Sequence, residues 1–279
     1  MDRRNLSLST KEQLLSTTSK GNQEKWYDPE ENVWYKADTF GWEALAEGVV
    51  STLLIRFSNV EREHGIPVVQ YGLGRRKVHG HERIVSISKN FLQEGQSIVT
   101  LHRLLSTAVP GYGKILAQAR SLPEKVRFLV DTVEAATGMH SFGPYLTLLF
   151  EVDALVLNTD RHLNNIAVLR TADGYRPCPV FDSGAALLLD QAVYPLDVDT
   201  KALIRQAESR PFQVSFGRLT GAARRLYGPQ LRVEFSAEDV RAIAAPLLVW
   251  YPAPLRDLVS LRIGEILMQE KKKYFEKTI

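Results

Sequence analysis

The sequence predicts an α+β protein of two lobes, a small lobe of antiparallel strands and a larger, mostly helical lobe. Short aromatic runs separated by turn residues fill the N-terminal third of the chain. Long stretches with apolar residues at helical spacing dominate the rest, interrupted by one pair of short apolar runs near residue 170. We place the boundary near residue 92, which gives lobes of residues 1–92 and 93–279.

Composition narrows the class of protein. A chain of 279 residues with 44% hydrophobic and 24% charged residues is typical of a soluble globular protein. A net charge of +3 is too small to indicate nucleic-acid binding, and the one cysteine, Cys178, excludes an internal disulfide. The N-terminus lacks the apolar core of a signal peptide, and Glu151 and Asp153 interrupt the longest apolar run. We therefore expect a cytoplasmic protein, or one delivered from a bacterial cytoplasm without a cleavable signal peptide, that has no membrane span and makes no direct nucleic-acid contacts.

The first predicted elements form a hairpin. Residues 25–27 and 33–36 are strand-like, and the segment between them has turn chemistry. Trp34 and Lys36 share one face of the second strand because side chains alternate along a strand. The preceding segment, residues 16–25, holds small hydroxyl residues and Gly21, so its backbone amides could approach a phosphate. A flexible linker is the alternative interpretation.

An amphipathic helix follows over residues 42–57, with apolar side chains at i, i+3, i+4 and i+7. It carries two glutamates, Glu43 and Glu47, either of which could pair with Lys36. Helical-wheel geometry puts Glu43 nearer the border of the apolar face. A lysine held by such a glutamate commonly neutralises the phosphates of a bound nucleotide.

The remaining predicted elements complete the two lobes. Residues 82–88 form a strand, followed by a polar hinge that leads to the second lobe. We interpret residues 71–76 and 79–81 as loop between strands, because their glycines and histidines lack the companions of a dinucleotide or metal site. Helices are expected over residues 100–106, 123–136, 142–157, 197–207, 210–226, 237–245 and 254–274.

The candidate catalytic segment runs from residue 158 to residue 184, with N-T-D-R-H-L-N-N-I-A-V-L followed by P-V-F-D-S-G. We predict a hairpin with strands at residues 166–169 and 178–181, joined by a turn at Asp173-Gly174. Asn165 stands just before its first strand and Asp182 just after its second, so both arrive at the same end. Together with Asp160 they supply two carboxylates and an amide, the set that metal-assisted phosphoryl transfer requires.

The motif D-R-H-x-x-N followed by F-D-S-G resembles that of HipA-like serine/threonine protein kinases, several of which are toxins of toxin–antitoxin modules. The D-R-H-x-x-N core is also similar to that of phosphatidylinositol 3- and 4-kinases. The resemblance implies a two-lobed, protein-kinase-like fold, ATP and Mg²⁺ as cofactors, a protein substrate and an antitoxin-like partner. It implies that Asp160 is the catalytic base and that Asn165 and Asp182 bind Mg²⁺. His162 could share the role of the base or brace the loop.

The same resemblance extends to the N-terminal lobe. The run from Thr18 through Ser19 and Gly21 is similar to the family's phosphate loop, where a hydroxyl residue is autophosphorylated. By alignment with the family, Glu47 is favoured over Glu43 as the partner of Lys36. The chain is shorter than full-length HipA-like toxins, which weakens the implied toxin role. A lipid or small-molecule kinase and a catalytically inactive scaffold are the alternative functions.

Overall fold

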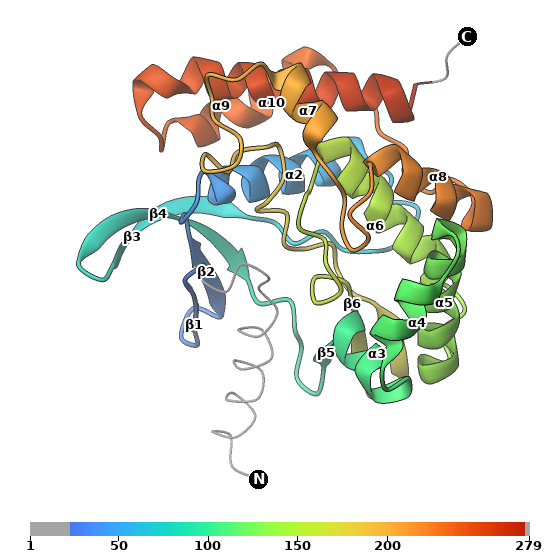
Figure 1. The fold of residues 1–279 in the computed structure, drawn as a ribbon. Coiled ribbons are helices and arrows are strands. Elements are labelled where there is room, and N and C mark those ends of the chain that lie inside the picture. The colour runs from blue at the N-terminus through green and yellow to red at the C-terminus, as the bar shows by residue number, and fades with distance from the viewer. Residues whose placement is uncertain (1–22, 277–279) are drawn as a thin grey trace.

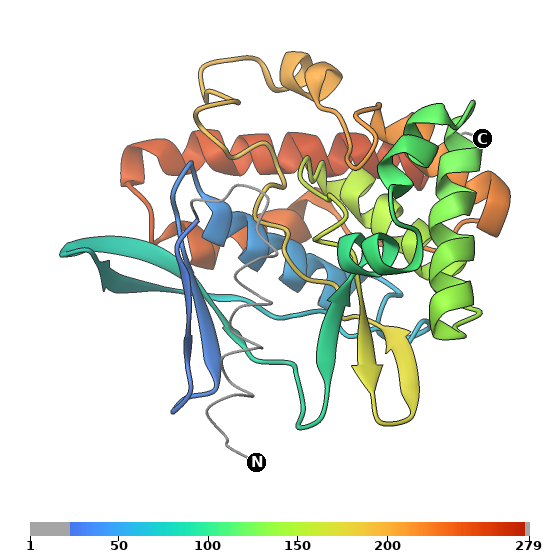
Figure 2. The same cartoon turned by 60° about the horizontal axis from the view of Figure 1, so that its bottom comes forward.

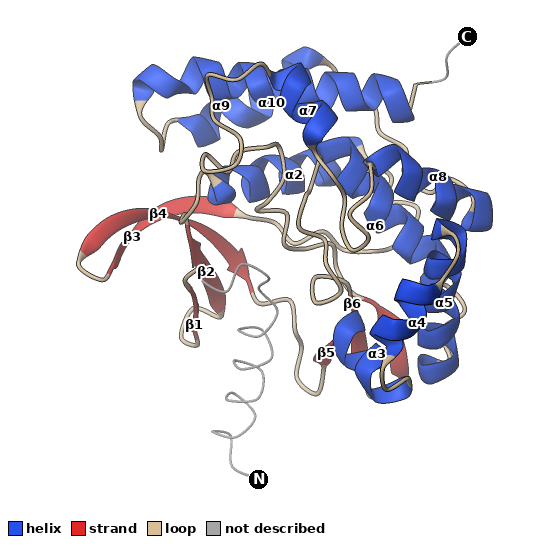
Figure 3. Cartoon of the chain, viewed as in Figure 1, coloured by secondary structure: helices blue, strands red, loops and turns tan. Residues whose placement is uncertain are grey.

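A computed structural model describes residues 23–276, and residues 1–22 and 277–279 lie outside the described part of the chain (Figure 1). The predicted phosphate-loop residues Thr18, Ser19 and Gly21 therefore fall outside the described residues. The fold is α+β, as predicted, with an antiparallel sheet toward the N-terminus and a larger helical part (Figure 3). Within residues 23–276, no helix is long and apolar enough to span a membrane.

The N-terminal sheet has four antiparallel strands in the order β1-β2-β4-β3. Their bounds are β1 Lys25–Asp28, β2 Val33–Ala37, β3 Gly72–Val78 and β4 His81–Lys89. The register sets Lys36 opposite Ser86 and Trp34 opposite Ser88, so all four side chains share one face. The other face carries a small apolar cluster of Tyr35, Ala37, Val78 and Val85.

Strand β3 corrects the sequence interpretation, which placed residues 71–76 in a loop. Its arginines are exposed because β3 is an edge strand, and charged side chains there hide the usual alternation of apolar residues. Gly74 lets the Ile87 side chain pack close to the strand, since a Cβ atom at position 74 would lie 2.9 Å from the end of that side chain. The predicted turn at residues 79–81 is shorter than expected, with His79 and Gly80 at positive φ between β3 and β4.

Helix α2, Glu43–Phe57, lies between the N-terminal sheet and helices α9 and α10 (Figure 1). It is buried almost all round, which explains why both of its glutamates are inside the protein. Gly41, just before the helix, lies against the chain at Leu189, where a Cβ atom would approach the Leu189 carbonyl oxygen to 2.0 Å. The close contact joins the start of α2 to the segment that follows Asp182.

The C-terminal part is mainly helical, with one three-stranded antiparallel sheet in the order β5-β6-β7 (Figure 2). Helix α6 is buried along its whole length at the centre of the core and packs against α5, α8 and α10. The other elements surround it: β5 Ser97–Thr100, α3 Leu101–Ala108, α4 Tyr112–Gln118, α5 Leu122–Thr137, α6 Phe142–Val156, β6 Ala167–Thr171, β7 Gly174–Pro177, α7 Thr200–Gln206, α8 Phe216–Tyr227, α9 Ala237–Leu248 and α10 Ala253–Tyr274.

Two predicted elements are corrected here, and two observed elements had no prediction. The return strand of the hairpin is β7, not residues 178–181, because Thr171 pairs directly with Gly174 around a two-residue turn. Val180 instead forms an isolated parallel bridge with Val68. The helix predicted from residue 210 begins at Phe216, because the chain first forms a closed loop between Ser209 and Val214. Strand β5 and helix α4 were not predicted.

Candidate active site

Three charged side chains meet, one each from β2, from α2 and from the segment after β7. Lys36 Nζ lies 2.5 Å from Glu47 Oε1 and 2.9 Å from Asp182 Oδ1. The second oxygen of Glu47 accepts a hydrogen bond from the Ser86 hydroxyl, which lies opposite Lys36 in the sheet. Glu47 is 1% exposed, whereas Lys36 and Asp182 keep 13% and 14% exposure, so the cluster opens to solvent on the Lys36–Asp182 side.

The choice between the two glutamates is clear from these contacts. Glu43 does not reach Lys36; its carboxylate accepts the backbone N–H groups of Thr39, Phe40 and Gly41 in the loop before α2. Glu43 therefore fixes the loop that leads into the helix. The lysine contact predicted for Glu47 is present.

Burial and neighbouring charges shift the pKa values of Lys36 and Asp182 in opposite directions. Burial alone would lower the pKa of Lys36, but the carboxylates of Asp182 and Glu47 raise it well above its usual value. Burial alone would raise the pKa of Asp182, but the Lys36 ammonium lowers it. Lys36 is therefore charged and Asp182 ionised at neutral pH. These are the charge states that the predicted nucleotide and metal contacts would require.

Asp182 is held by its backbone as well as by its side chain. Its φ of 60° is unusual for a residue other than glycine, and its N–H donates to the Tyr71 hydroxyl at 3.3 Å. Tyr71 is buried, with Lys36 Nζ 5.6 Å from the centre of its ring. Tyr71 was not predicted as a site residue, because the glycine-rich pattern of residues 71–76 indicated a loop.

The catalytic segment begins where α6 ends. Leu157 adopts a left-handed conformation after the last turn of the helix and directs the chain away from the core toward Asp160. Asn165 folds back over this turn, and its Nδ2 donates to the backbone carbonyl of Asp160 at 3.1 Å. The other amide atom, Asn165 Oδ1, is buried and accepts no hydrogen bond from the residues that the structure describes. An oriented acceptor without a donor is suited to a cation.

Arg161 connects the two halves of the motif. Its guanidinium is 1% exposed and donates from Nε and Nη2 to the Asp153 carboxylate of α6 at 3.1–3.2 Å. Its Nη1 donates to the backbone carbonyls of Asn165 at 3.0 Å and of Phe181 at 2.8 Å. One side chain therefore holds the residue before Asp182 beside Asn165, so the two predicted metal ligands are brought to the same place.

His162 is positioned by its own loop. Its Nδ1 accepts the Asn164 N–H at 3.1 Å, so the neutral ring carries its proton on Nε2. Nε2 is buried and has no hydrogen-bond partner among residues 23–276. Burial lowers the pKa of His162, which keeps the ring neutral at pH 7. His162 therefore acts as a hydrogen-bond donor or supports the loop. It cannot act as a base through Nε2, because that nitrogen carries the proton and has no free lone pair.

A cation near Asp160 was not predicted from the sequence. Arg210 Nε lies 3.9 Å from Asp160 Oδ1, and the Arg210 side chain is 46% exposed. The apolar spacing of residues 210–226 predicts a helix with Arg210 in its first turn. In the structure it stands in the loop before α8, which returns the chain from α7 to the catalytic segment.

The predicted magnesium ligands fit the ion chemically. Asn165 offers a buried, unpaired oxygen and Asp182 an ionised carboxylate, and hard oxygens are the ligands that Mg²⁺ prefers. In the part of the chain that the structure describes, no group of three or more His, Cys, Asp or Glu side chains could hold a metal. Two protein ligands completed by phosphate oxygens and water are usual for Mg²⁺ at nucleotide sites.

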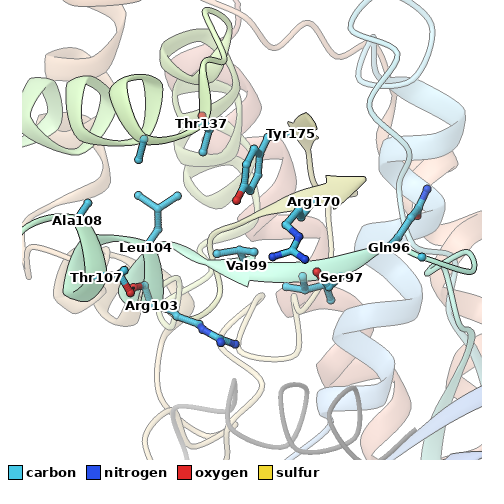
Figure 4. Close-up of a pocket in the computed structure, with 13 residues that line it drawn as sticks. Gln96, Ser97, Val99, Arg103, Leu104, Thr107, Ala108, Thr137, Arg170 and Tyr175 are labelled. Atoms are coloured by element: carbon cyan, nitrogen blue, oxygen red, sulfur yellow. The ribbon is translucent and has the colours of Figure 1, made fainter. Parts of the chain in front are cut away.

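A cavity of about 700 Å³ lies apart from this site, between α3, the end of α5 and the three-stranded sheet (Figure 4). Arg170 of β6 and Tyr175 of β7 extend from neighbouring strands into it, and Leu104 and Thr107 line it from α3 (Figure 4). None of the predicted site residues lines this cavity, so it is not part of the proposed phosphoryl-transfer site.

Comparison with solved structures finds the same architecture in a kinase. The chain is similar to the proinflammatory kinase CtkA of Helicobacter pylori, with a TM-score of 0.56 and 16% sequence identity. The match covers 92% of this chain and 89% of that chain. No protein-family model and no curated protein matches the sequence. The fold is therefore kinase-like; the HipA-like assignment stays a prediction.

Proposed function

We propose that this protein is an ATP- and Mg²⁺-dependent kinase that phosphorylates serine or threonine hydroxyls of a protein. The observation that carries the proposal is the contact of Lys36 with both Glu47 and Asp182, three residues from three separate parts of the sequence. Lysine, glutamate and metal-binding aspartate occupy this arrangement in active protein kinases. The kinase-like fold supports the same conclusion.

Each residue then has a chemical role. Lys36, oriented by Glu47, neutralises phosphate oxygens of the nucleotide. Asn165 Oδ1 and the Asp182 carboxylate hold Mg²⁺, which when bound neutralises charge on the triphosphate. Asp160 orients the acceptor hydroxyl and takes its proton.

The surroundings of Asp160 refine this role. Arg210 Nε lies 3.9 Å from the Asp160 carboxylate, so a cation stands beside the proposed base before the acceptor arrives. His162 supplies an N–H on Nε2 rather than a lone pair, so we assign proton acceptance to Asp160 alone. The partial charge of that N–H can stabilise negative charge that develops near the catalytic loop.

Regulation by autophosphorylation belongs to the same proposal. Thr18 and Ser19 precede Gly21 in the predicted phosphate loop, and a phosphate there adds about −1.5 to −2 charge. The phosphate on the loop and the triphosphate of ATP are both strongly negative and cannot share one pocket. A phosphorylated loop would therefore exclude ATP. Mass spectrometry of wild-type protein and of Asp160→Asn tests this: phosphate on residues 16–19 only in the wild type supports it. An unmodified loop in an active enzyme contradicts it.

The function is tested by phosphate transfer from labelled ATP to proteins of a bacterial lysate, followed by identification of the modified residue. Phosphoserine or phosphothreonine that requires Asp160 is the expected product. Labelled lipid or metabolite in place of protein would favour the phosphatidylinositol-kinase-like alternative. Nucleotide binding without transfer to any acceptor would favour the inactive scaffold. An antitoxin-like partner is tested separately by co-purification of the protein from its native cells.

A further inference from the structure

A second, strongly basic pocket lies at the start of helix α8. Its volume is about 650 Å³, and its ten lining residues come from the start of α5, the start of α8 and the end of α10 and include Arg120, Ser215, Arg218, Arg225 and Lys273. Four of these side chains are cations and none is an acid. Cations of this density repel one another, so their collection in one hollow indicates an anionic ligand.

The arginines of the pocket have no acidic partner within residues 23–276. Arg120, Arg218 and Arg225 are exposed and form no ion pair with a described residue. By contrast, Arg161, Arg224 and Arg232 elsewhere in the chain each pair with a carboxylate. Lys273 is shared with Glu270 at 3.2 Å. Three guanidinium groups are therefore available for a ligand, and each can bind phosphate through two parallel hydrogen bonds.

The backbone at the start of α8 adds to the attraction of the pocket for an anion. Helix α8 is twelve residues long, and its N-cap, Ser215, makes no capping hydrogen bond in the described structure. The first N–H groups of a helix have no intrahelical partner and carry partial positive charge, which favours phosphate. Gly221 leaves room for Arg225 to lie back along the helix toward this end, since Nη1 is 4.0 Å from where a Cβ at Gly221 would be.

One short loop, residues 209–214, connects the pocket with the candidate catalytic segment. Ser209 and Val214 pair across its base, with Ser209 N–H 2.8 Å from the Val214 carbonyl oxygen. Arg210 and Ser215 flank this pair, so their Cα atoms lie within about 13 Å of each other. Arg210 faces Asp160, and Ser215 lines the pocket. An extended peptide at about 3.3 Å per residue covers the distance between the two sites with about four to seven residues.

We propose that this pocket binds a phosphate group already present on the protein substrate and so sets which hydroxyl reaches Asp160. The inference rests on the proposed kinase function and adds the class of substrate, a phosphoprotein. A phosphorylated residue about four to seven positions from the acceptor occupies the pocket, held by Arg120, Arg218 and Arg225 and by the start of α8. Proximity to Asp160 favours a substrate segment over a lipid headgroup.

The test measures peptide binding by fluorescence anisotropy in the Asp160→Asn protein, which prevents turnover during the experiment. The probes are serine peptides that carry phosphoserine two, five, eight or twelve residues from the acceptor, and their unmodified forms. We expect phosphorylation at the offset of five to tighten binding at least tenfold. The triple variant Arg120→Gln, Arg218→Gln, Arg225→Gln should lose this gain, and the triple lysine variant, which keeps the charge, should lose part of it.

A matched control separates the pocket from general charge. Arg176, Arg205 and Arg241 are exposed and form no described ion pair, so their triple glutamine variant has the same net charge as the pocket variant. The control should keep the full tenfold gain, and thermal unfolding checks that both variants are folded. Equal losses in both, a gain that ignores the offset, or arginine-dependent binding to anionic vesicles with no peptide preference would overturn the proposal.

The two proposals fail separately. In one outcome, the wild type transfers phosphate equally to unmodified and phosphorylated proteins while the peptide assay shows no preference for phosphoserine. That result contradicts the role of the pocket and leaves the kinase proposal intact. Peptide discrimination in a protein that transfers no phosphate from ATP removes the kinase and with it the substrate role of the pocket.

Discussion

The guanidinium of Arg161 and the carboxylate of Asp153 form a buried ion pair, with Nε 3.1 Å from Oδ2. Asp153 belongs to the central helix α6, so the catalytic segment is anchored in the core. The remaining donor of Arg161 reaches the carbonyls of Asn165 and Phe181. The pair therefore aligns two segments that are sixteen residues apart in sequence.

Removing one partner of this pair should be costly. Arg161→Met leaves Asp153 buried without a counter-charge, and we expect the free energy of unfolding to fall by about 3–5 kcal/mol. The double variant Arg161→Met, Asp153→Leu should recover part of the loss, because no isolated charge remains. Urea denaturation measures both. A loss below about 1 kcal/mol in the single variant would contradict the assigned role.

Asp160→Asn should separate chemistry from binding. We expect the rate of phosphate transfer to fall by about 10²–10⁴, since a positioned base contributes a factor of this size. Nucleotide affinity and thermal stability should stay close to wild type, because Asp160 is partly exposed and lies outside the Lys36 cluster. Transfer kinetics at saturating ATP measure the effect, and near-wild-type turnover would move the role of the base to His162.

Lys36→Met should weaken nucleotide binding more than Glu47→Gln. The first change removes the cation and leaves the Glu47 and Asp182 carboxylates close together, whereas the second keeps the cation and loses its orientation. We expect at least a tenfold loss of ATP affinity for Lys36→Met by calorimetry. Glu43→Gln is the control: it should leave the affinity unchanged, because Glu43 bonds only the loop before α2. Equal losses in all three variants would indicate a general disturbance of the helix.

Asn165→Ala should change the requirement for magnesium. The variant loses the unpaired Oδ1 acceptor and the Nδ2 bond to Asp160, so the half-saturating Mg²⁺ concentration for transfer should rise several-fold. Asn165→Asp offers the control, since it restores an oxygen ligand with added charge. If both variants keep the wild-type magnesium dependence, Asn165 does not bind the ion.

Stability should depend on pH through Asp38. Burial raises the pKa of this carboxyl to about 7, although the Ala44 N–H and the Tyr251 hydroxyl both donate to it. The folded protein retains the proton where the unfolded chain has released it. The protonated Asp38 carboxyl therefore stabilises the fold fully below about pH 4, and this stabilisation is lost as the pH rises through 7. The unfolding free energy of the wild type relative to that of Asp38→Asn should therefore fall from pH 4.5 to about pH 7 and change little up to pH 8.5. A relative stability independent of pH would contradict the prediction.

Local patterns predicted much of the fold. The α2 and α6 ranges and the first hairpin came from periodicity, since their apolar residues repeat at regular spacing. The edge strand β3 did not, because glycine and arginine occupy positions where apolar residues would mark a strand. Residues 178–181 are apolar for a different reason: they are buried by packing rather than by pairing in a hairpin, which a single sequence cannot distinguish.

For the candidate site, motifs located the polar side chains that the structure brings together, including Lys36 with Asp182 across 146 positions. The contacts of Tyr71 and Arg210 depend on how distant segments pack, so no local pattern contained them. The basic pocket escaped prediction for the same reason, because its arginines come from the start of α5 and from α8.

Helix α2 is fastened at its start. Trp42 stacks on Tyr251 with ring centres 4.5 Å apart, and the Tyr251 hydroxyl bridges Asp38 and the Leu45 N–H. Movement of α2 that separates Glu47 from Lys36 would first have to break the contacts of Tyr251 with Trp42, Asp38 and Leu45. For the proposed kinase we therefore expect control to act on access of ligands to the Lys36–Glu47 pair rather than on movement of the helix.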